Sequence, residues 1–378
     1  MVETYAVIGA NYGDEGKGLV ANALCREAFL DKKAVLNVLT NGGPQRGHTA
    51  YDERGRRHIY SHFGAGYAYA DIYFSKYYMV NPMTFMQEYD ELKKMEQADV
   101  AADRMKVLNL IYIDPKCMIT TPWDMLVNRI LENRRSNGRH GSCGYGIWES
   151  VRRNKVMPIY WEDFFFKDRL EIFYILKAVR DVYFASVLKE YGLILDYQEG
   201  RYFYSDILIN NFINDIFAMQ RLALPRTYES LVGDYDRVVF ENAQGLLLDD
   251  EVDPWGTPTK TDLTYVRSIV GHNDITPYYV TRTYLTKHGN GYFDGECAKA
   301  DINPLMVDKT NQPNDYQGTL RYGTFNEARA HDLRTRIKDD AAGLDYKVVV
   351  THTNEFECPY LTFGDFYSDN ETEIKPTN

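Results

Sequence analysis

Residues 4–18 read Thr-Tyr-Ala-Val-Ile-Gly-Ala-Asn-Tyr-Gly-Asp-Glu-Gly-Lys-Gly, and this stretch decides the fold class. Its first six residues are β-rich and end at a glycine, while Lys17–Phe29 has the apolar spacing of a helix. Successive backbone N–H groups in such a loop, together with the start of the helix, form a cradle for phosphate. The sequence therefore predicts a strand, a P-loop-like nucleotide-binding loop and a helix.

The loop departs from the GxxxxGK[ST] pattern of phosphate-binding loops at two positions. Asn11 stands where the first glycine belongs, and Gly18 stands where a metal-binding hydroxyl belongs. A metal ion then needs another oxygen ligand, and Asp14 inside the loop is the obvious one. The alternative is a glycine-rich turn in which Lys17 only meets solvent, but the flanking strand and helix favour phosphate binding.

Strand-like and helix-like segments alternate along the rest of the chain. We expect strands at 34–39, 107–113, 238–240, 278–284 and 346–350. We expect helices at 82–95 and 123–133 and a mainly helical segment at 156–235. Polar or glycine-rich loops follow several strands. This alternation predicts an α/β protein with a mostly parallel central sheet flanked by helices, and with ligands along the carboxyl edge of the strands.

Composition limits the classes of function. The chain has 378 residues, with 43 Lys and Arg against 54 Asp and Glu, a net charge of −11. This disfavours a nucleic-acid polymer as partner, because a duplex-binding face needs clustered cations. No apolar run approaches the ~18 residues of a membrane span, so we expect no membrane partner. Five scattered cysteines predict reduced thiols in a cytoplasmic protein, or in the host cytoplasm if the protein is viral.

Domain organisation is predicted to be simple. No internal repeat or low-complexity linker divides the chain, and the last residues are polar. We expect a single domain over residues 1–367 and a polar C-terminal tail over 368–378.

Six fragments, in order along nearly the whole chain, resemble the adenylosuccinate synthetase family. The family's WGDEGKG, GGNNAGHT and GTTGRGIG loops appear here as Tyr12–Gly18, Gly42–Thr49 and Gly141–Ile147. Its FEGAQGTLLD, VTSSNTT and YSTRVGAGPF motifs appear as Phe240–Asp249, Pro258–Thr264 and Tyr284–Phe293. One such fragment would be a weak signal, whereas six in the right order are a specific one.

The resemblance implies a ligase that joins L-aspartate to C6 of a 6-oxopurine nucleotide, driven by a nucleoside triphosphate and Mg²⁺. Asp14 would remove the N1 proton of the purine and, with Gly47, hold Mg²⁺. The purine O6 would attack the γ-phosphate, and Lys17 would neutralise charge on the phosphates. His48 would stabilise and protonate around O6. A lone histidine is more often structural, but its place in a GHT loop beside GDEGKG favours catalysis.

Further site residues are implied by the same motif positions. The triphosphate would be bound by Gly13, Glu15, Gly16, Lys17, Gly18, Gly47, Thr49 and Asn354. The acceptor nucleotide would be bound by Asn41, Gln45, Ser142, Cys143, Arg152, Gln244, Thr259 and Lys287. Aspartate would be bound by Thr319 and Arg321. Arg152 stands where an arginine of a partner subunit is expected, which implies a homodimer.

Three of these acceptor-site residues have a plainer alternative. Gln244 would cap a turn, Thr259 would be an ordinary loop hydroxyl, and Lys287, an arginine in the family, would be a solvated lysine.

Departures from the family pattern bear on the choice of nucleotide. Members that use GTP read guanine with a TKxD motif, whereas this chain carries Thr351-His-Thr-Asn354. Asparagine offers one acceptor and one donor where guanine presents two donors, so an adenine donor such as ATP or dATP fits better. The arginine-rich aspartate loop is reduced to residues 318–323, in which only Arg321 survives.

The loop before His48 also differs, since Pro44, Gln45 and Arg46 replace Asn-Asn-Ala. The sequence suggests no role for Arg46. With the ending at 360–366, these changes resemble a phage branch, the 2-aminoadenylosuccinate synthases, which use dGMP on the route to 2-aminoadenine DNA. That branch usually has a smaller residue at the position of Asp14. A carboxylate can nevertheless accept from both N1–H and N2–H of guanine.

Three alternatives stay open. The first is an ordinary adenylosuccinate synthetase of AMP biosynthesis, using IMP and GTP. The second is a P-loop ATPase or kinase with another substrate, in which His48 has no role. The third is a non-catalytic nucleotide-binding relative, which the thinned arginine loop keeps plausible.

Overall fold

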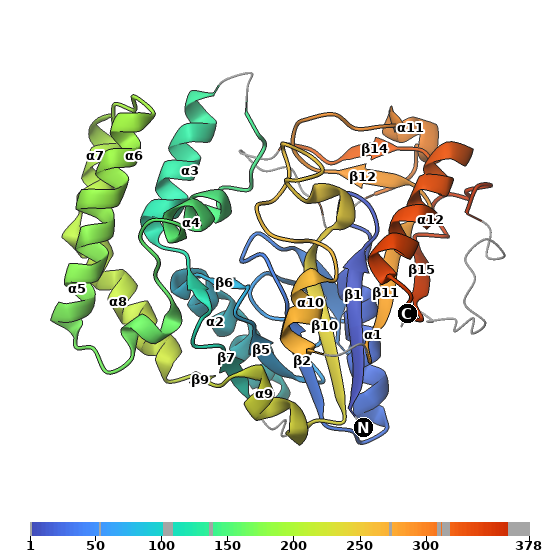
Figure 1. Cartoon of the computed structure of the whole chain (residues 1–378), viewed down its shortest axis with the longest axis horizontal. Helices are drawn as coiled ribbons and strands as arrows, with labels where there is room; N and C mark the ends of the chain where they lie inside the picture. The colour runs from blue at the N-terminus through green and yellow to red at the C-terminus, as the bar shows by residue number, and fades with distance from the viewer. Residues whose placement is uncertain are drawn as a thin grey trace.

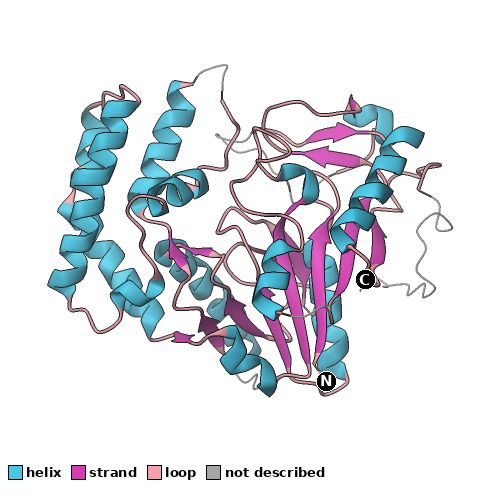
Figure 2. Cartoon of the chain, in the orientation of Figure 1, coloured by secondary structure: helices cyan, strands magenta, loops and turns pink. Residues whose placement is uncertain are grey.

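An eight-stranded sheet forms the centre of the computed structural model (Figures 1 and 2). The structure describes residues 2–52, 54–100, 109–135, 139–271, 274–307, 311 and 318–361. In the described part the strand order is β15-β11-β1-β10-β2-β5-β7-β9, and neighbouring strands run parallel. The bounds are β1 Glu3–Gly9, β2 Val35–Leu39, β5 Asp71–Phe74, β7 Ile111–Ile113, β9 Ala223–Pro225, β10 Arg237–Gly245, β11 Thr276–Arg282 and β15 Lys347–Thr351. The predicted α/β fold is confirmed.

The middle strands bring the motif-bearing loops together. β1 lies between β10 and β11, with Tyr5 opposite Val239 on one side and Thr276 on the other. β2 pairs with the other edge of β10. Because parallel strands end at the same edge of a sheet, the loops that follow β1, β2, β10 and β11 meet there.

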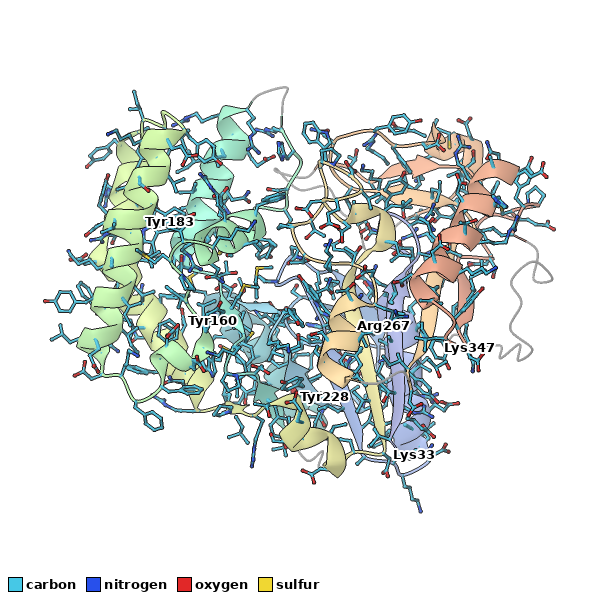
Figure 3. All side chains as sticks on the ribbon, viewed as in Figure 1. Lys33, Tyr160, Tyr183, Tyr228, Arg267 and Lys347 are labelled. Atoms are coloured by element: carbon cyan, nitrogen blue, oxygen red, sulfur yellow. The ribbon has the colours of Figure 1, made fainter. Side chains whose placement is uncertain are left out.

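Helices cover both faces of the sheet. Val239 of β10 packs into the core that contains α1 (Lys17–Leu30), whereas Val238 and Phe240 pack into the core of α10 (Thr264–Val270) and α12 (Glu327–Ala341). Such two-sided burial explains why the strands read as nearly continuous apolar runs. Arg267 of α10, labelled in Figure 3, donates to the last carbonyls of α12. This contact fixes the two helices to each other.

A group of helices lies at the left of Figure 1. This group consists of α5 Arg169–Ala178, α6 Ala185–Glu190, α7 Tyr197–Phe203 and α8 Asp206–Gln220, with α3 Pro122–Arg134 and α4 Ile147–Asn154 beside it. The other helices of this part of the chain are α2 Pro82–Val100 and α9 Tyr228–Leu231. Asp168 and Asp196 cap α5 and α7 through capping boxes. The prediction of a mainly helical segment at 156–235 is confirmed, except that it contains the short strand β9.

Short strands account for the places where the sequence prediction was wrong. The strand expected to end at Tyr284 ends at Arg282, and β12 (Leu285–Lys287) then opens a small antiparallel sheet with β14 (Arg321–Gly323) and β13 (Glu296–Cys297). The strand expected at 107–113 is strand only at 111–113, and residues 107–108 lie outside the described part. The loop expected at 40–49 ends in strand, because β3 (His48–Tyr51) pairs with β4 (Arg57–Tyr60).

The remaining elements are minor. They are β6 Met79–Val80, β8 Met118–Ile119, α11 Lys299–Ile302 and the short turns of helix at Trp161–Phe164, Val179–Phe184, Val232–Asp234 and Leu246–Leu248. The predicted tail at 368–378 lies outside the described residues, and the single domain over 1–367 stays a prediction. Within the described residues, no helix has the length and apolar character needed to cross a membrane.

Candidate active site

The loop between β1 and α1 has the backbone of an anion-binding turn. Gly13 and Gly16 adopt φ of 98° and 97°, and Asp14 adopts φ of 63°, a left-handed conformation that aspartate tolerates better than most residues. The N–H groups of Asn11 and Gly13 converge on the carboxylate of Glu15, at 3.1 and 2.7 Å. An internal carboxylate therefore holds this loop in shape from behind.

Lys17 forms a buried ion pair with the same carboxylate. Its ammonium lies 2.8 Å from Glu15 Oε2, and both side chains are 2% exposed. Burial alone would raise the pKa of Glu15, but the charge and hydrogen bond of Lys17 and the amide of Gly13 outweigh it and lower the pKa below 4.5. Glu15 is consequently ionised.

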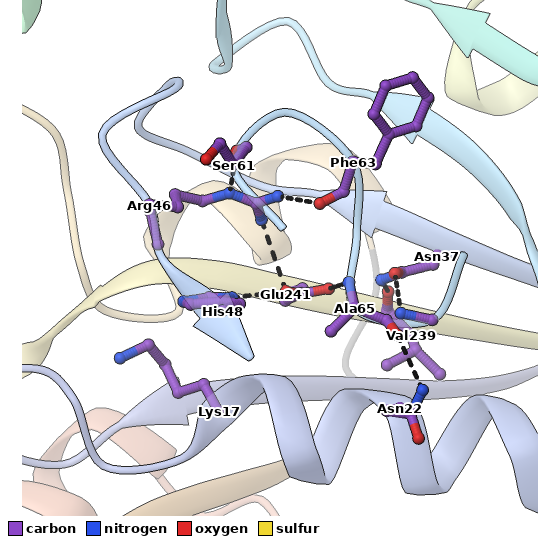
Figure 4. Close-up of polar contacts among 12 residues, drawn as sticks. Lys17, Asn22, Asn37, Arg46, His48, Ser61, Phe63, Ala65, Val239 and Glu241 are labelled. Atoms are coloured by element: carbon purple, nitrogen blue, oxygen red, sulfur yellow. Dashed lines mark hydrogen bonds and ion pairs between the residues drawn. The ribbon is translucent and has the colours of Figure 1, made fainter. Parts of the chain in front are cut away.

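His48 is oriented by a carboxylate on the central strand β10. Its Nδ1 lies 2.5 Å from Glu241 Oε1, and Glu241 Oε2 accepts from the N–H of Ala65 at 3.0 Å (Figure 4). An ionised carboxylate only accepts hydrogen bonds, so the proton of the neutral imidazole sits on Nδ1. His48 Nε2 is buried and has no hydrogen-bond partner among the described residues.

Electrostatics around this pair favour a neutral imidazole and an ionised acid. Burial lowers the pKa of His48, and the nearby charges of Arg46 and Lys17 lower it further against the opposing effect of Glu241. Burial would raise the pKa of Glu241, but Arg46 and His48 lower it below its ordinary value. The imidazole is thereby left with a free nitrogen for an additional group.

These loops border one large cavity of about 900 Å³. Many of the residues predicted from separate motifs share its wall. They are Gly13, Asp14, Gly16, Lys17, Gly18, Gln45, Gly47, His48, Thr49, Ser142, Cys143, Arg152 and Gln244. Positions up to about 230 residues apart in the chain thus meet at the carboxyl edge of the sheet, where the parallel topology predicts a ligand site.

Asp14 faces this cavity with a neighbouring histidine. Its Oδ2 lies 3.4 Å from Nε2 of His288, and its side chain is 20% exposed. Nε2 of His288 also lies 3.2 Å from Oδ1 of Asn311. The described residues contain no group of three or more His, Cys, Asp or Glu side chains that would hold a metal alone. One carboxylate is still a sufficient protein anchor for Mg²⁺, which completes its shell from phosphates and water.

Seven predicted site residues lie outside the cavity wall: Glu15, Asn41, Thr259, Lys287, Thr319, Arg321 and Asn354. Asn41 donates to the carbonyl of Lys260 at 2.6 Å and accepts from the N–H of Ala243 at 2.8 Å. The hydroxyls of Thr257 and Thr259 lie 3.2 Å apart. Asn41 and Thr259 therefore shape the loops around the cavity rather than facing it.

The basic members of this group are already paired. Lys287 is buried and forms an ion pair with Asp253, and it also donates to the carbonyl of Tyr292 at 2.9 Å. Arg321 forms a two-pronged contact with Glu296, at 2.7 and 2.6 Å. Thr319 and Asn354 are exposed, Asn354 in the turn after β15. A substrate carboxylate that binds Arg321 must displace Glu296 or share the guanidinium with it.

The cavity wall also contains groups that the sequence analysis missed. Glu149 on α4 is 5% exposed, its Oε2 has no hydrogen-bond partner among described residues, and burial raises its pKa to about 7. Arg152, one helical turn along, binds Glu190 through both carboxylate oxygens and stacks on Tyr191. Glu241, which lies behind His48 and does not line the cavity, was also missed. Its position inside an apolar strand could have indicated a role, because a buried acid must be paired.

Cys143 lines the cavity, and burial raises the pKa of its thiol to about 11. The thiol is therefore protonated at neutral pH and is not a nucleophile there.

Comparison with known sequences gives one consistent match. The family model described as adenylosuccinate synthetase matches residues 6–315. The adenylosuccinate synthetase of Halothermothrix orenii is 24% identical over 319 residues, covering 81% of this chain and 68% of that protein. The adenylosuccinate synthetase of Crocosphaera subtropica is 25% identical over 315 residues, covering 80% and 64%. This chain thus spans about two thirds of the length of these relatives.

Two solved structures share the fold. Fully ligated adenylosuccinate synthetase from Plasmodium falciparum matches with a TM-score of 0.71 at 18% identity, covering 93% of this chain and 77% of that chain. Cyanophage S-2L succinoaminodeoxyadenylate synthetase, bound to dGMP and to dATP as an energy donor, matches with a TM-score of 0.55 at 15% identity, covering 93% of each chain. At these identities the likeness is one of fold.

Proposed function

Because this chain belongs to the adenylosuccinate synthetase family of carbon–nitrogen ligases, we propose that it joins L-aspartate to C6 of a 6-oxopurine nucleotide, driven by a nucleoside triphosphate with Mg²⁺ as cofactor. One observation carries this proposal: Asp14, Lys17, His48 and Gln244 line a single cavity. An acid, a cation, an imidazole and an amide around one space match what the reaction needs.

In the first step, Asp14 accepts the N1 proton of the purine, and O6 attacks the γ-phosphate. The O6–phosphorus bond forms as the bond to the β-phosphate oxygen breaks, so the nucleoside diphosphate leaves. The amides of the 14–18 loop and Lys17, which must share its ammonium with Glu15 or leave that ion pair, neutralise charge on the phosphates. The oxo group, which is a poor leaving group, has become a phosphate ester.

In the second step, the aspartate amine attacks C6 and the phosphate leaves with O6. We assign to His48 the hydrogen bond or proton that this oxygen needs, given from Nε2, which is buried without a partner within the described part of the chain. Because Nε2 carries no proton in the neutral ring, the ring must first take up a proton there from solvent, and Glu241 at Nδ1 then balances the charge of the imidazolium. The amine loses a proton as the C6–N bond forms. Glu241 maintains the orientation of the ring during this exchange.

Mg²⁺, when bound, would supply further neutralisation of phosphate charge. The residues that would hold it are Asp14, through its carboxylate, and Gly47, through its backbone carbonyl; both line the cavity.

For the nucleotides, we favour dGMP as acceptor and ATP or dATP as donor, as in 2-aminoadenylosuccinate synthases. Asn354 in place of a guanine-reading aspartate supports an adenine donor. Pro44 in the loop before His48 resembles the phage branch. Asp14 favours the second candidate, an ordinary synthetase using IMP and GTP, although a carboxylate can accept both N1–H and N2–H of guanine.

The test is a matrix of IMP, GMP, dIMP and dGMP against ATP, dATP and GTP, with aspartate and Mg²⁺, analysed by mass spectrometry. A product equal to dGMP plus aspartate less water, made with an adenine donor, supports the favoured assignment. Product from IMP and GTP alone refutes it in favour of the ordinary synthetase. Asp14→Asn should abolish product, whereas Asp339→Asn on the exposed face of α12 should not. Nucleotide binding without product in any mixture would indicate a non-catalytic relative, for which the pairing of Arg321 with Glu296 is the supporting observation.

We also propose a homodimer in which Arg152 serves the neighbouring site. Mixing Asp14→Asn with Arg152→Ala chains tests this, because hybrid dimers with shared sites would regain one intact site. Recovery of activity on mixing, with a dimer mass by light scattering, is expected. A monomer, or no recovery in a mixed dimer, would contradict it.

A further inference from the structure

Arg46 is a buried cation between the turn at 61–66 and the carboxylate behind His48 (Figure 4). Its side chain is fully buried, and Nη1 lies 3.6 Å from Glu241 Oε1. Nε donates to the carbonyl of Ser61 at 3.1 Å, and Nη2 donates to the carbonyl of Phe63 at 2.7 Å. The guanidinium thus links the turn at 61–66 to the Glu241 carboxylate, and that carboxylate in turn contacts the imidazole of His48.

The turn at 61–66 is itself anchored on several sides. Asn22 of α1 donates to the carbonyl of Ala65 at 2.9 Å, and Asn37 of β2 accepts from the N–H of Gly66 at 3.0 Å. Glu88 of α2 accepts from the N–H of Ser61 at 3.0 Å. An arginine bound to this turn is therefore bound to a fixed platform.

Among the described residues, Arg46 is the only permanently charged partner of Glu241. Its carboxylate also interacts with His48 and with Cys25, Tyr60 and Tyr78, which are neutral because burial raises the pKa of that thiol and of both phenols. Lys17, the other cation near His48, is paired with Glu15. A buried carboxylate needs a compensating charge or must take up a proton.

We propose that Arg46 is a positioning residue, which holds the Glu241 carboxylate against Nδ1 of His48 and so presents Nε2 of the ring to the reacting purine. This role for Arg46 deepens the ligase function proposed above, and its kinetic consequences rest on that function. The position is an alanine in the family motif that this loop resembles, so the clamp belongs to this chain. Arginine suits it, because its planar fork donates to two carbonyls while its charge lies 3.6 Å from the Glu241 carboxylate, an arrangement that the single ammonium of lysine does not reproduce.

The decisive readout is the tautomer of His48, observed through the ¹⁵N shifts of its two ring nitrogens in ¹⁵N-histidine-labelled protein without ligands. The wild type should show a protonated Nδ1 and an unprotonated Nε2. Arg46→Met should shift both signals toward the average of the two tautomers, and Arg46→Lys should restore part of the difference. The control is Arg153→Met, which removes another fully buried arginine that binds a carboxylate and backbone carbonyls, those of Asp124, Ile119 and Met157. It should leave the His48 signals unchanged.

Kinetics supply a second, independent readout. Arg46→Met should lower kcat about tenfold with KM for both nucleotides within about twofold, as expected when a group acts through another rather than on the substrate. In a Glu241→Gln background the same substitution should change kcat less than about twofold, since its target is already lost.

Three results would overturn the proposal. One is a folded Arg46→Met protein whose His48 ring signals match the wild type. Another is an equal shift in Arg153→Met. The third is a full tenfold loss in the Glu241→Gln background. A protein without any aspartate-dependent activity would refute the ligase assignment, and the ring signals would still decide the role of Arg46.

Discussion

Replacing Glu149 by glutamine should stabilise the protein at alkaline pH and destabilise it by about 1 kcal/mol in acid. The wild-type carboxyl on α4 is 5% exposed, and burial raises its pKa from 4.5 to about 7. Below pH 4.5 it is protonated in both the folded and the unfolded chain and contributes nothing to the difference. As the pH rises through 4.5 toward 7, the unfolded chain releases its proton first, so folding loses stability.

The magnitude follows from the size of that shift. Each pKa unit corresponds to about 1.4 kcal/mol, so the wild type loses about 3 kcal/mol of unfolding free energy between pH 4 and pH 8 through this one group. Glutamine keeps the shape and removes the charge, at a cost of about 1 kcal/mol for an amide with no partner. We expect Glu149→Gln to gain about 2 kcal/mol at pH 8.

Urea denaturation of both proteins at pH 4.5 and pH 8 measures the effect. Glu91→Gln, on the exposed face of α2, is the control and should change the unfolding free energy by the same small amount at both pH values. A Glu149→Gln protein that is less stable than the wild type at pH 8, or whose effect is the same at both pH values, would refute the reasoning.

Three further substitutions test other parts of the site. Gly18→Ala would place a Cβ 2.9 Å from that of His48, so we expect a loss of about 1–3 kcal/mol in unfolding free energy and of at least about tenfold in kcat. The control Gly200→Ala, in open space on α7, should instead stabilise the protein by up to about 1 kcal/mol. Urea denaturation measures the stability of both variants, and steady-state kinetics measure kcat. Lys287→Met should lower the unfolding free energy by about 3 kcal/mol, because it leaves the carboxylate of Asp253, which is only 13% exposed, without its cation. A raised nucleotide KM in an equally stable protein would instead indicate a phosphate-binding lysine. Asn354→Asp should raise the kcat/KM ratio of GTP to ATP about tenfold, and an unchanged ratio would remove Asn354 from the donor site.

Local sequence signals predicted the elements that carry the site. β1 and α1 were predictable because an apolar run, a glycine loop and a helical repeat stand next to each other. The meeting of Asp14 with Gln244 was predictable in outline, since parallel strands deliver their loops to one edge. Short strands such as β9 were missed, because three residues carry no periodicity and depend on a neighbour for pairing.

The parts of the site that could not be predicted depend on contacts between residues far apart in the sequence. Arg46 was uninterpretable in sequence, because its role depends on a turn that starts 15 residues later and on a strand almost 200 residues away. Glu149 lies on a helix that packs against α3, so the burial of this acid depends on a neighbouring element and cannot be read from its residue type. The pairing of Arg321 with Glu296 likewise arises only when β13 and β14 become neighbours.

The internal carboxylate behind the β1–α1 loop has a consequence for affinity. Because Glu15 already satisfies the amides of Asn11 and Gly13 and the charge of Lys17, the loop acquires its shape during folding and not on arrival of a ligand. The entropy lost in ordering those residues is then absent from the association equilibrium, and more of the contact energy with a triphosphate appears as binding strength. In a Glu15→Ala chain the loop would be less ordered before the triphosphate binds, and titration calorimetry should show a larger unfavourable entropy of binding.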